Sequence, residues 1–114
     1  MNLRNRVQLV GNIGKNPVVR ELNNGGKMVR FSLATNEYYM KDGERVQETT
    51  WHTLVAWGKT AEIVANYMET GAELMVGGRL KNRVYTDDKG TTRYITEVIV
   101  DEVLFRSKKD KQAA

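Results

Sequence analysis

Apolar and polar residues alternate along most of this chain, as they do in strands that bury one face. The alternation predicts strands at about residues 7–13, 27–39, 49–57, 74–84 and 91–105, with 18–22 as a short extension of the first. Asn23-Asn24-Gly25-Gly26 lies between that extension and the next strand. It is a strong hairpin signal, because these residues tolerate the positive φ that tight turns need.

Between the third and fourth of these strands the apolar period changes to that of a helix. Residues of helical spacing predict a helix of about ten residues there: Ile63, Val64, Tyr67 and Met68. The apolar set of the fourth strand is interrupted at Gly77-Gly78, where a bulge or bend is expected: Leu74, Val76, Leu80 and Val84. We therefore predict an all-β fold, a five-stranded Greek-key barrel of the OB-fold type with one short helix between strands 3 and 4.

The composition agrees with one small domain. The chain has 114 residues, and a domain usually takes roughly 100–200. We expect the domain to span residues 1–105 and a disordered basic tail to follow at 106–114. The chain has 18 Lys and Arg against 14 Asp and Glu, but most of the excess lies in that tail, so residues 1–105 carry a net charge of only +1. An anionic partner must therefore be bound by a local cluster of charge.

Catalytic and metal-binding chemistry has few candidates in this sequence. The chain has no Cys, and His52 is its only histidine, so neither a metal site nor a nucleophile with its base is indicated. We expect no enzyme, no metal and no cofactor, with His52 as a structural or interface residue; an enzyme domain that uses His52 is the alternative. No apolar run approaches the ~18 residues of a membrane span, so no membrane partner is expected. The lack of Cys fits a cytoplasmic protein.

Aromatic and basic residues gather on the predicted strands. Trp51 and Trp57 share parity on the third strand, so both indoles project from one face. The fourth strand adds a row of one parity opposite its apolar set, and two neighbouring residues extend it: Arg79, Lys81, Arg83 and Tyr85, with Tyr39 and Lys59. Cations follow phosphates while rings stack on unpaired bases, so this pattern favours a single-stranded nucleic acid as partner.

Two other readings of these residues stay open at this point. Trp51 and Trp57 are core residues in the first, because tryptophan is highly buried on average, and the basic row is then an ordinary solvated face. In the second, the same rings pack against a protein, as in a primosome-type adaptor or another OB-fold interaction module.

Short motifs in colinear order connect the chain with a known family. They run over about residues 4–100 and include Val10-Gly11-Asn12-Ile13-Gly14, Asn24-Gly25-Gly26, Leu33-Ala34-Thr35-Asn36-Glu37, Thr50-Trp51-His52, Trp57-Gly58-Lys59 and Tyr85-Thr86-Asp87. In this the chain resembles the bacterial single-stranded DNA-binding proteins. The resemblance implies a homotetramer of OB-folds that binds and protects single-stranded DNA with little sequence preference, in replication, recombination and repair. It also implies a cytoplasmic, nucleoid-associated location.

The resemblance assigns roles to individual residues. It implies that four rings stack on bases: Tyr39, Trp51, Trp57 and Tyr85. It implies phosphate contacts at Arg20, Lys59, Lys81 and Arg83. It also implies a subunit contact at His52 and pairing between subunits along the first strand, at Arg4, Arg6, Val7, Gln8, Leu9 and Val10.

The end of the chain departs from the family pattern. Family members usually continue into a flexible linker with an acidic, hydrophobic tip that recruits replication and repair proteins. Residues 106–114 are basic and lack such a tip. A truncated chain and a short paralogue both fit this ending, and recruitment of replication and repair proteins stays an open expectation.

Overall fold

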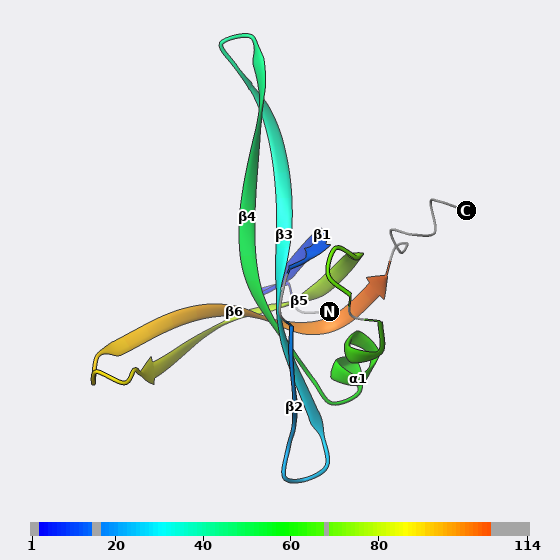
Figure 1. Cartoon of the computed structure of the whole chain (residues 1–114), viewed down its shortest axis with the longest axis vertical. Coiled ribbons are helices and arrows are strands. Elements are labelled where there is room, and N and C mark those ends of the chain that lie inside the picture. The colour runs from blue at the N-terminus through cyan, green and yellow to red at the C-terminus, as the bar shows by residue number, and fades with distance from the viewer. Residues whose placement is uncertain (1–2, 15–16, 68, 106–114) are drawn as a thin grey trace.

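The structure is a computed structural model that describes residues 3–14, 17–67 and 69–105 (Figure 1). The tail expected to be disordered, residues 106–114, lies outside the described residues. The elements follow one another in the order β1 (Val7–Ile13), β2 (Val18–Glu21), β3 (Lys27–Lys41), β4 (Glu44–Trp57), α1 (Gly58–Tyr67), β5 (Glu73–Thr86) and β6 (Thr92–Phe105).

The strands form one sheet that closes into a barrel. Their order is β1-β5-β6-β4-β3-β2, and an additional pairing between β1 and β3, with Ile13 opposite Leu33, closes the barrel. β4 and β6 run parallel, and every other pair is antiparallel. β2 forms a hairpin with β3, as the turn signal at residues 23–26 predicts. The predicted five-stranded OB-fold, with its helix between the third and fourth barrel strands, is confirmed.

Inward-facing side chains of alternating parity fill the barrel. The core includes Ile13, Val29, Phe31, Leu33, Leu54, Leu74, Val76, Val98 and Val100. α1 adds Ala61 and Val64 to this core, whereas Ile63, predicted on the same apolar face, is exposed. Each fully buried aliphatic side chain contributes about 1.5–3 kcal/mol, so the alternation fixes which face of each barrel strand is left for binding.

The β3–β4 arm (residues 36–49) is a long hairpin that extends well beyond the barrel (Figure 1). Asp42 and Gly43 form its turn with φ values of 52° and 80°, the conformation that Asp-Gly favours in two-residue hairpin turns. Residues 41–44, which lie between the predicted strands 27–39 and 49–57, are therefore a tight turn with Lys41 opposite Glu44. β4 consequently begins at Glu44 rather than at the predicted Thr49.

The β5–β6 arm (residues 80–96) is a second projecting hairpin (Figure 1). Leu80 and Val84 were predicted to share the core face of Leu74 and Val76, and this prediction is wrong, because both are exposed. β1 pairs with β5 only as far as Gly78. Beyond that point β5 has β6 as its one partner strand among the described residues, and a two-stranded hairpin has no core in which to bury these side chains.

Gly78 marks the place where β5 leaves the barrel. The pairing with β6 shifts register between Gly77 and Gly78, which confirms the expected irregularity. A Cβ atom at Gly78 would collide with the backbone carbonyl of Ile99 on β6. A strand this close to its neighbour's backbone admits only glycine.

Gly78→Ala is therefore expected to lower the free energy of unfolding by about 1–3 kcal/mol, because the new methyl group forces the two strands apart. Chemical denaturation at a fixed protein concentration measures the change. Gly26→Ala is the matched control, since its Cβ would meet chiefly the side-chain oxygen of Asn24, which can move. Equal denaturation midpoints for the two variants would contradict the close approach of β5 to β6 as the cause of the lost stability.

Candidate nucleic-acid interface

Both tryptophans stand on the outer surface of the barrel. Trp51 is 61% exposed and Trp57 is 49% exposed, while Leu54, on the opposite parity of β4, is fully buried in the core. These exposures exclude core packing for the two indoles. Two large rings on one face of one strand give a flat apolar surface that is open to solvent, which suits stacking on a planar partner.

Trp57 lies beside basic residues from three other strands. Arg20 on β2 is opposite Met28 on β3, and Met28 is opposite Trp57. An open cleft of about 270 Å³ is lined by Met28, Arg30, Val55, Trp57, Lys81, Arg83, Glu97 and Ile99. The structure thus brings together the predicted Trp57, Lys81 and Arg83. It also adds Arg30 and Glu97, which were not among the predicted site residues.

Glu97 is the electrostatic centre of this cleft. It is only 4% exposed, and its Oε2 accepts hydrogen bonds from Arg30 Nη2 at 3.2 Å and from Arg83 Nη2 at 3.1 Å. Arg83 Nε donates to the other carboxylate oxygen at 3.4 Å. One carboxylate therefore holds two guanidinium groups on the binding face, and the three residues together keep a net positive charge.

Tyr85 lies toward the end of β5, on the same strand face as Arg83. The guanidinium carbon of Arg83 is 5.5 Å from the centre of the Tyr85 ring, within the range of a cation–π contact. Tyr85 is exposed. The Trp57 cleft therefore continues as a row of cation and ring along the β5–β6 arm.

Asp87 closes the turn that follows Tyr85. Its Oδ1 accepts hydrogen bonds from the backbone N–H groups of Lys89 and Thr91, and its Oδ2 accepts one from Arg93 Nε, each at 2.9 Å. The Arg93 donor, followed by the Thr91 N–H, holds the pKa of the Asp87 carboxyl below its ordinary value. This stabilising contribution is present above the unfolded-state pKa and is lost as the pH falls through the lowered folded-state value. At neutral pH the turn stays closed and Arg93 stays opposite Tyr85.

Trp51 borders a second open cleft, of about 490 Å³, at the other end of the outer face. Ile13, Gly14, Ser32, Thr70 and Gly71 line it with the indole. A Cβ atom at Gly14 would come within 2.8 Å of the Trp51 ring. The indole therefore lies close against glycine backbone, which holds one edge of the ring while leaving most of it exposed.

The remaining predicted contact residues do not line the two clefts that Trp51 and Trp57 border. Lys59 is exposed in the first turn of α1, two residues after Trp57. Arg20 is exposed on β2. Tyr39 is exposed, but its ladder position opposite Val46 puts it on the other face of the β3–β4 arm from Trp51. The structure thus does not bring Tyr39 into the row formed by the tryptophans.

The comparisons with known proteins agree with this geometry. Residues 4–106 match the single-strand binding protein family. The chain belongs to that family. Its fold is similar to a solved structure described as a Plasmodium falciparum SSB complex with ssDNA, with a TM-score of 0.81 and 29% sequence identity. The match covers 94% of this chain and 100% of that one.

Arg30 of this single-strand binding protein had a sequence signal that the prediction did not use. It lies between Val29 and Phe31, which are buried, so alternation alone puts it on the outer face. Glu97 precedes the buried Val98 in the same way. Its burial was not predictable from alternation, because it depends on Arg30, which is 67 residues away in sequence.

β1 and the segment before it carry the residues predicted at a subunit interface. Val7 and Leu9 are half-buried, and Arg4, Arg6, Gln8 and Val10 are exposed. β1 pairs with β5 from Val7 to Asn12, but with β3 only at its last two residues, so within the described chain one edge of its first five residues has no partner strand.

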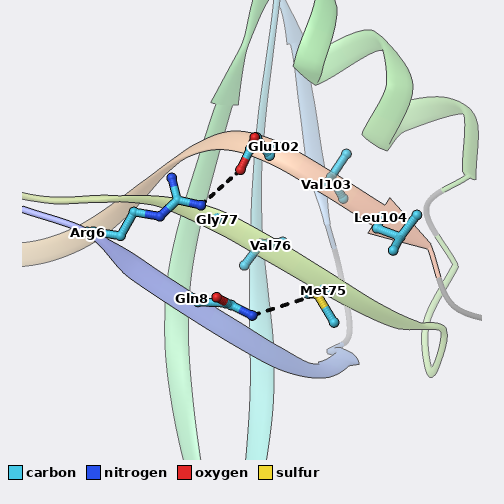
Figure 2. Close-up of a pocket in the computed structure, with 8 residues that line it drawn as sticks. All are labelled: Arg6, Gln8, Met75, Val76, Gly77, Glu102, Val103 and Leu104. Atoms are coloured by element: carbon cyan, nitrogen blue, oxygen red, sulfur yellow. Dashed lines mark hydrogen bonds and ion pairs between the residues drawn. The ribbon is translucent and has the colours of Figure 1, made fainter. Parts of the chain in front are cut away.

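A cleft of about 360 Å³ lies over β1, β5 and β6 (Figure 2), and no aromatic ring lines it. Arg6 Nη2 donates to Glu102 Oε1 at 2.9 Å across it, and Gln8 Nε2 lies 3.9 Å from Met75 Sδ (Figure 2). Arg6 and Gln8, predicted as interface residues, thus share one surface that is separate from the nucleic-acid face.

His52 lies on the opposite parity of β4 from Trp51 and is half-buried. Its Nε2 is 2.9 Å from the hydroxyl of Thr35, a diagonal neighbour on β3, whereas Leu33 is the residue directly opposite His52. Among the described residues no group of three or more acidic, His or Cys side chains is placed to hold a metal ion. In the same residues no helix is long and apolar enough to cross a membrane.

Replacing Glu97 by Gln is expected to lower the free energy of unfolding by about 1–3 kcal/mol, because two guanidinium groups lose their shared anion in a buried position. Glu102→Gln is the control: its side chain is exposed and paired with Arg6, so its loss is expected below about 1 kcal/mol. Denaturant titrations of the two variants measure both values. A Glu97→Gln loss no greater than that of Glu102→Gln would contradict the assigned role.

Proposed function

We propose that the chain binds and protects single-stranded DNA without catalysis, by stacking unpaired bases on Trp51, Trp57 and Tyr85 while cations meet the phosphates. The observation that carries the proposal is the exposure of both indoles on one barrel face. The cations assigned to phosphate are Arg20, Arg30, Lys59, Lys81 and Arg83. Tyr39 stays a predicted ring that faces away from this row.

Stacking explains the preference for a single strand. Each base that stacks on an aromatic side chain contributes roughly 1–3 kcal/mol, so three rings supply about 3–9 kcal/mol before the cost of ordering the DNA. Paired bases are already stacked on one another and cannot reach the rings. Every base has a flat face, so the contacts carry little sequence preference. This activity suits the roles in replication, recombination and repair that are typical of the family.

We also propose that the chain assembles as a homotetramer. The unpaired edge of β1 supports this, because a free strand edge is a template for pairing with a second copy. His52 on β4 is assigned to a subunit contact by its resemblance to the family, and no catalytic role is proposed for it. A cytoplasmic, nucleoid-associated location in a bacterium and recruitment of replication and repair proteins belong to the same proposal.

Titration with poly(dT) tests the binding. We expect strong quenching of tryptophan fluorescence that saturates at a fixed ratio of nucleotide to protein. Trp51→Ala is expected to weaken binding by about 1–3 kcal/mol with the salt dependence unchanged, since it removes a stacking ring. Lys81→Ala is expected instead to make the slope of log K against log salt shallower by roughly 0.7, since it removes one phosphate contact.

Tyr94→Ala is the matched control for these variants. Tyr94 is exposed but lies opposite Val84, on the face of the β5–β6 arm that Tyr85 does not share. Its loss is expected to leave affinity and salt slope near those of the unmodified protein. No quenching by poly(dT), together with saturable binding to another protein, would favour the interaction-module reading instead.

Light scattering tests the assembly. We expect a molar mass about four times the 13.0 kDa of the chain, reduced in Val10→Lys because a lysine on the β1 edge opposes pairing with another strand. Val19→Lys on β2 is the control, since Val19 is an exposed valine of similar exposure outside β1. A monomeric mass for the unmodified protein, or equal effects of the two variants, would reject this assignment.

A further inference from the structure

The register of the β3–β4 arm decides which of two adjacent tyrosines shares the face of Trp51. Trp51 lies opposite Ala34, and Tyr38 lies opposite Gln47, in a ladder with no register shift between them. Side chains alternate along each strand, so Tyr38 is on the Trp51 face. Tyr39 is on the other face.

Side-chain hydrogen bonds mark the same face between the two rings. Thr49 Oγ1 donates to Asn36 Oδ1 at 2.6 Å, and Gln47 Nε2 donates to the same oxygen at 3.2 Å. These three residues form a polar strip from the Trp51 end of the arm to Tyr38. Gln47, opposite Tyr38, is four positions before Trp51 on β4, a span of about 13 Å at roughly 3.3 Å per residue.

Arg45 holds the Tyr38 ring. Its guanidinium carbon lies 4.1 Å from the ring centre, a cation–π contact that restricts the ring while 52% of Tyr38 stays exposed. Arg83 and Tyr85 repeat this pairing on the β5–β6 arm, at 5.5 Å. Both arms thus carry a tyrosine backed by an arginine, and bases stack on guanidinium planes as well as on rings.

The two faces of the β3–β4 arm differ in charge. The Tyr38 face carries one arginine and no acid: Asn36, Tyr38, Met40, Arg45, Gln47 and Thr49. The Tyr39 face carries three glutamates and one lysine: Glu37, Tyr39, Lys41, Glu44, Val46 and Glu48. A phosphate backbone is attracted to the first face and repelled by the second.

We propose that Tyr38 and Arg45 form a further single-stranded DNA subsite on this arm, continuous with Trp51. An unpaired base stacks on the Tyr38–Arg45 pair, and Arg45 meets a neighbouring phosphate. Tyr39, although 46% exposed, contributes less to DNA binding. The subsite rests on the proposed function, because it extends the same row of rings.

Adjacent alanine substitutions test the subsite. Fluorescence anisotropy with a dye-labelled oligo(dT) is measured for Tyr38→Ala and Tyr39→Ala at several salt concentrations. We expect Tyr38→Ala to raise the Kd about 5- to 150-fold, the loss of one stacked base, and to raise it more than Tyr39→Ala does. Tyr38→Phe, which keeps the ring, is expected to bind nearly as the unmodified protein.

The role of Arg45 is tested by the salt dependence of binding, with a separate control variant. Arg45→Ala is expected to make the salt slope shallower by about 0.7, whereas Lys41→Ala, on the acidic face, leaves it unchanged. Molar mass is measured for every variant. A loss of binding in Tyr38→Ala that accompanies a changed molar mass would assign Tyr38 to a subunit contact and overturn the proposal.

The Trp51→Ala variant distinguishes a failure of the Tyr38–Arg45 subsite from a failure of the proposed function. If Trp51→Ala weakens binding but Tyr38→Ala does not, or if Tyr39→Ala costs as much as Tyr38→Ala, the subsite is rejected and the proposed function stands. If the unmodified protein fails to bind oligo(dT), or Trp51→Ala leaves the affinity unchanged, the stacking function itself is rejected. A selective loss in Tyr38→Ala at constant molar mass supports the subsite.

Discussion

The antiparallel ladder between β3 and β4 is the constraint on which the binding surface depends. It runs without a register shift from Met28 opposite Trp57 on the barrel to the turn at the arm tip. One parity of this ladder supplies Leu33 and Leu54 to the core, and the other parity faces outward. A slip of one residue would exchange the faces, burying the indoles and exposing the core. The packing of the barrel therefore fixes the position of both tryptophans.

In the proposed function, the low charge of the folded part leaves base stacking as the larger contribution to affinity. Residues 1–105 carry a net charge of only +1, so long-range attraction for a polyanion is weak. In the Trp57 cleft Glu97 offsets one of the two guanidinium groups that it holds. This lowers the local positive charge but keeps Arg30 and Arg83 in place before DNA arrives, which reduces the ordering cost of binding. Such a surface discriminates by the availability of base faces more than by phosphate density.

Alternation predicted the barrel because residues of the core cluster recur with period two on β3, β4, β5 and β6. It also placed Trp51, Trp57 and Lys81 on one surface, since each follows the outward parity of its own strand. Its prediction that Leu80 and Val84 are buried was wrong. Alternation shows which residues share a face of a strand, but it does not show whether another element packs against that face. It did not separate Tyr38 from Tyr39, because that distinction depends on the cross-strand register, which the Asp42–Gly43 turn sets.

The rings on the barrel strands are more rigidly supported than the rings on the hairpin arms. Residues 36–41 of β3 are exposed on both faces, so the arm depends on its backbone ladder and on cross-strand pairs of roughly 0.2–1 kcal/mol each. Trp51 and Trp57 extend from a strand whose other face is core. A base that stacks on an arm must offset the ordering of the hairpin, whereas a base that stacks on the barrel meets a ring already in place. In the proposed function, the barrel rings therefore need less ordering than the arm rings do when a base stacks on them.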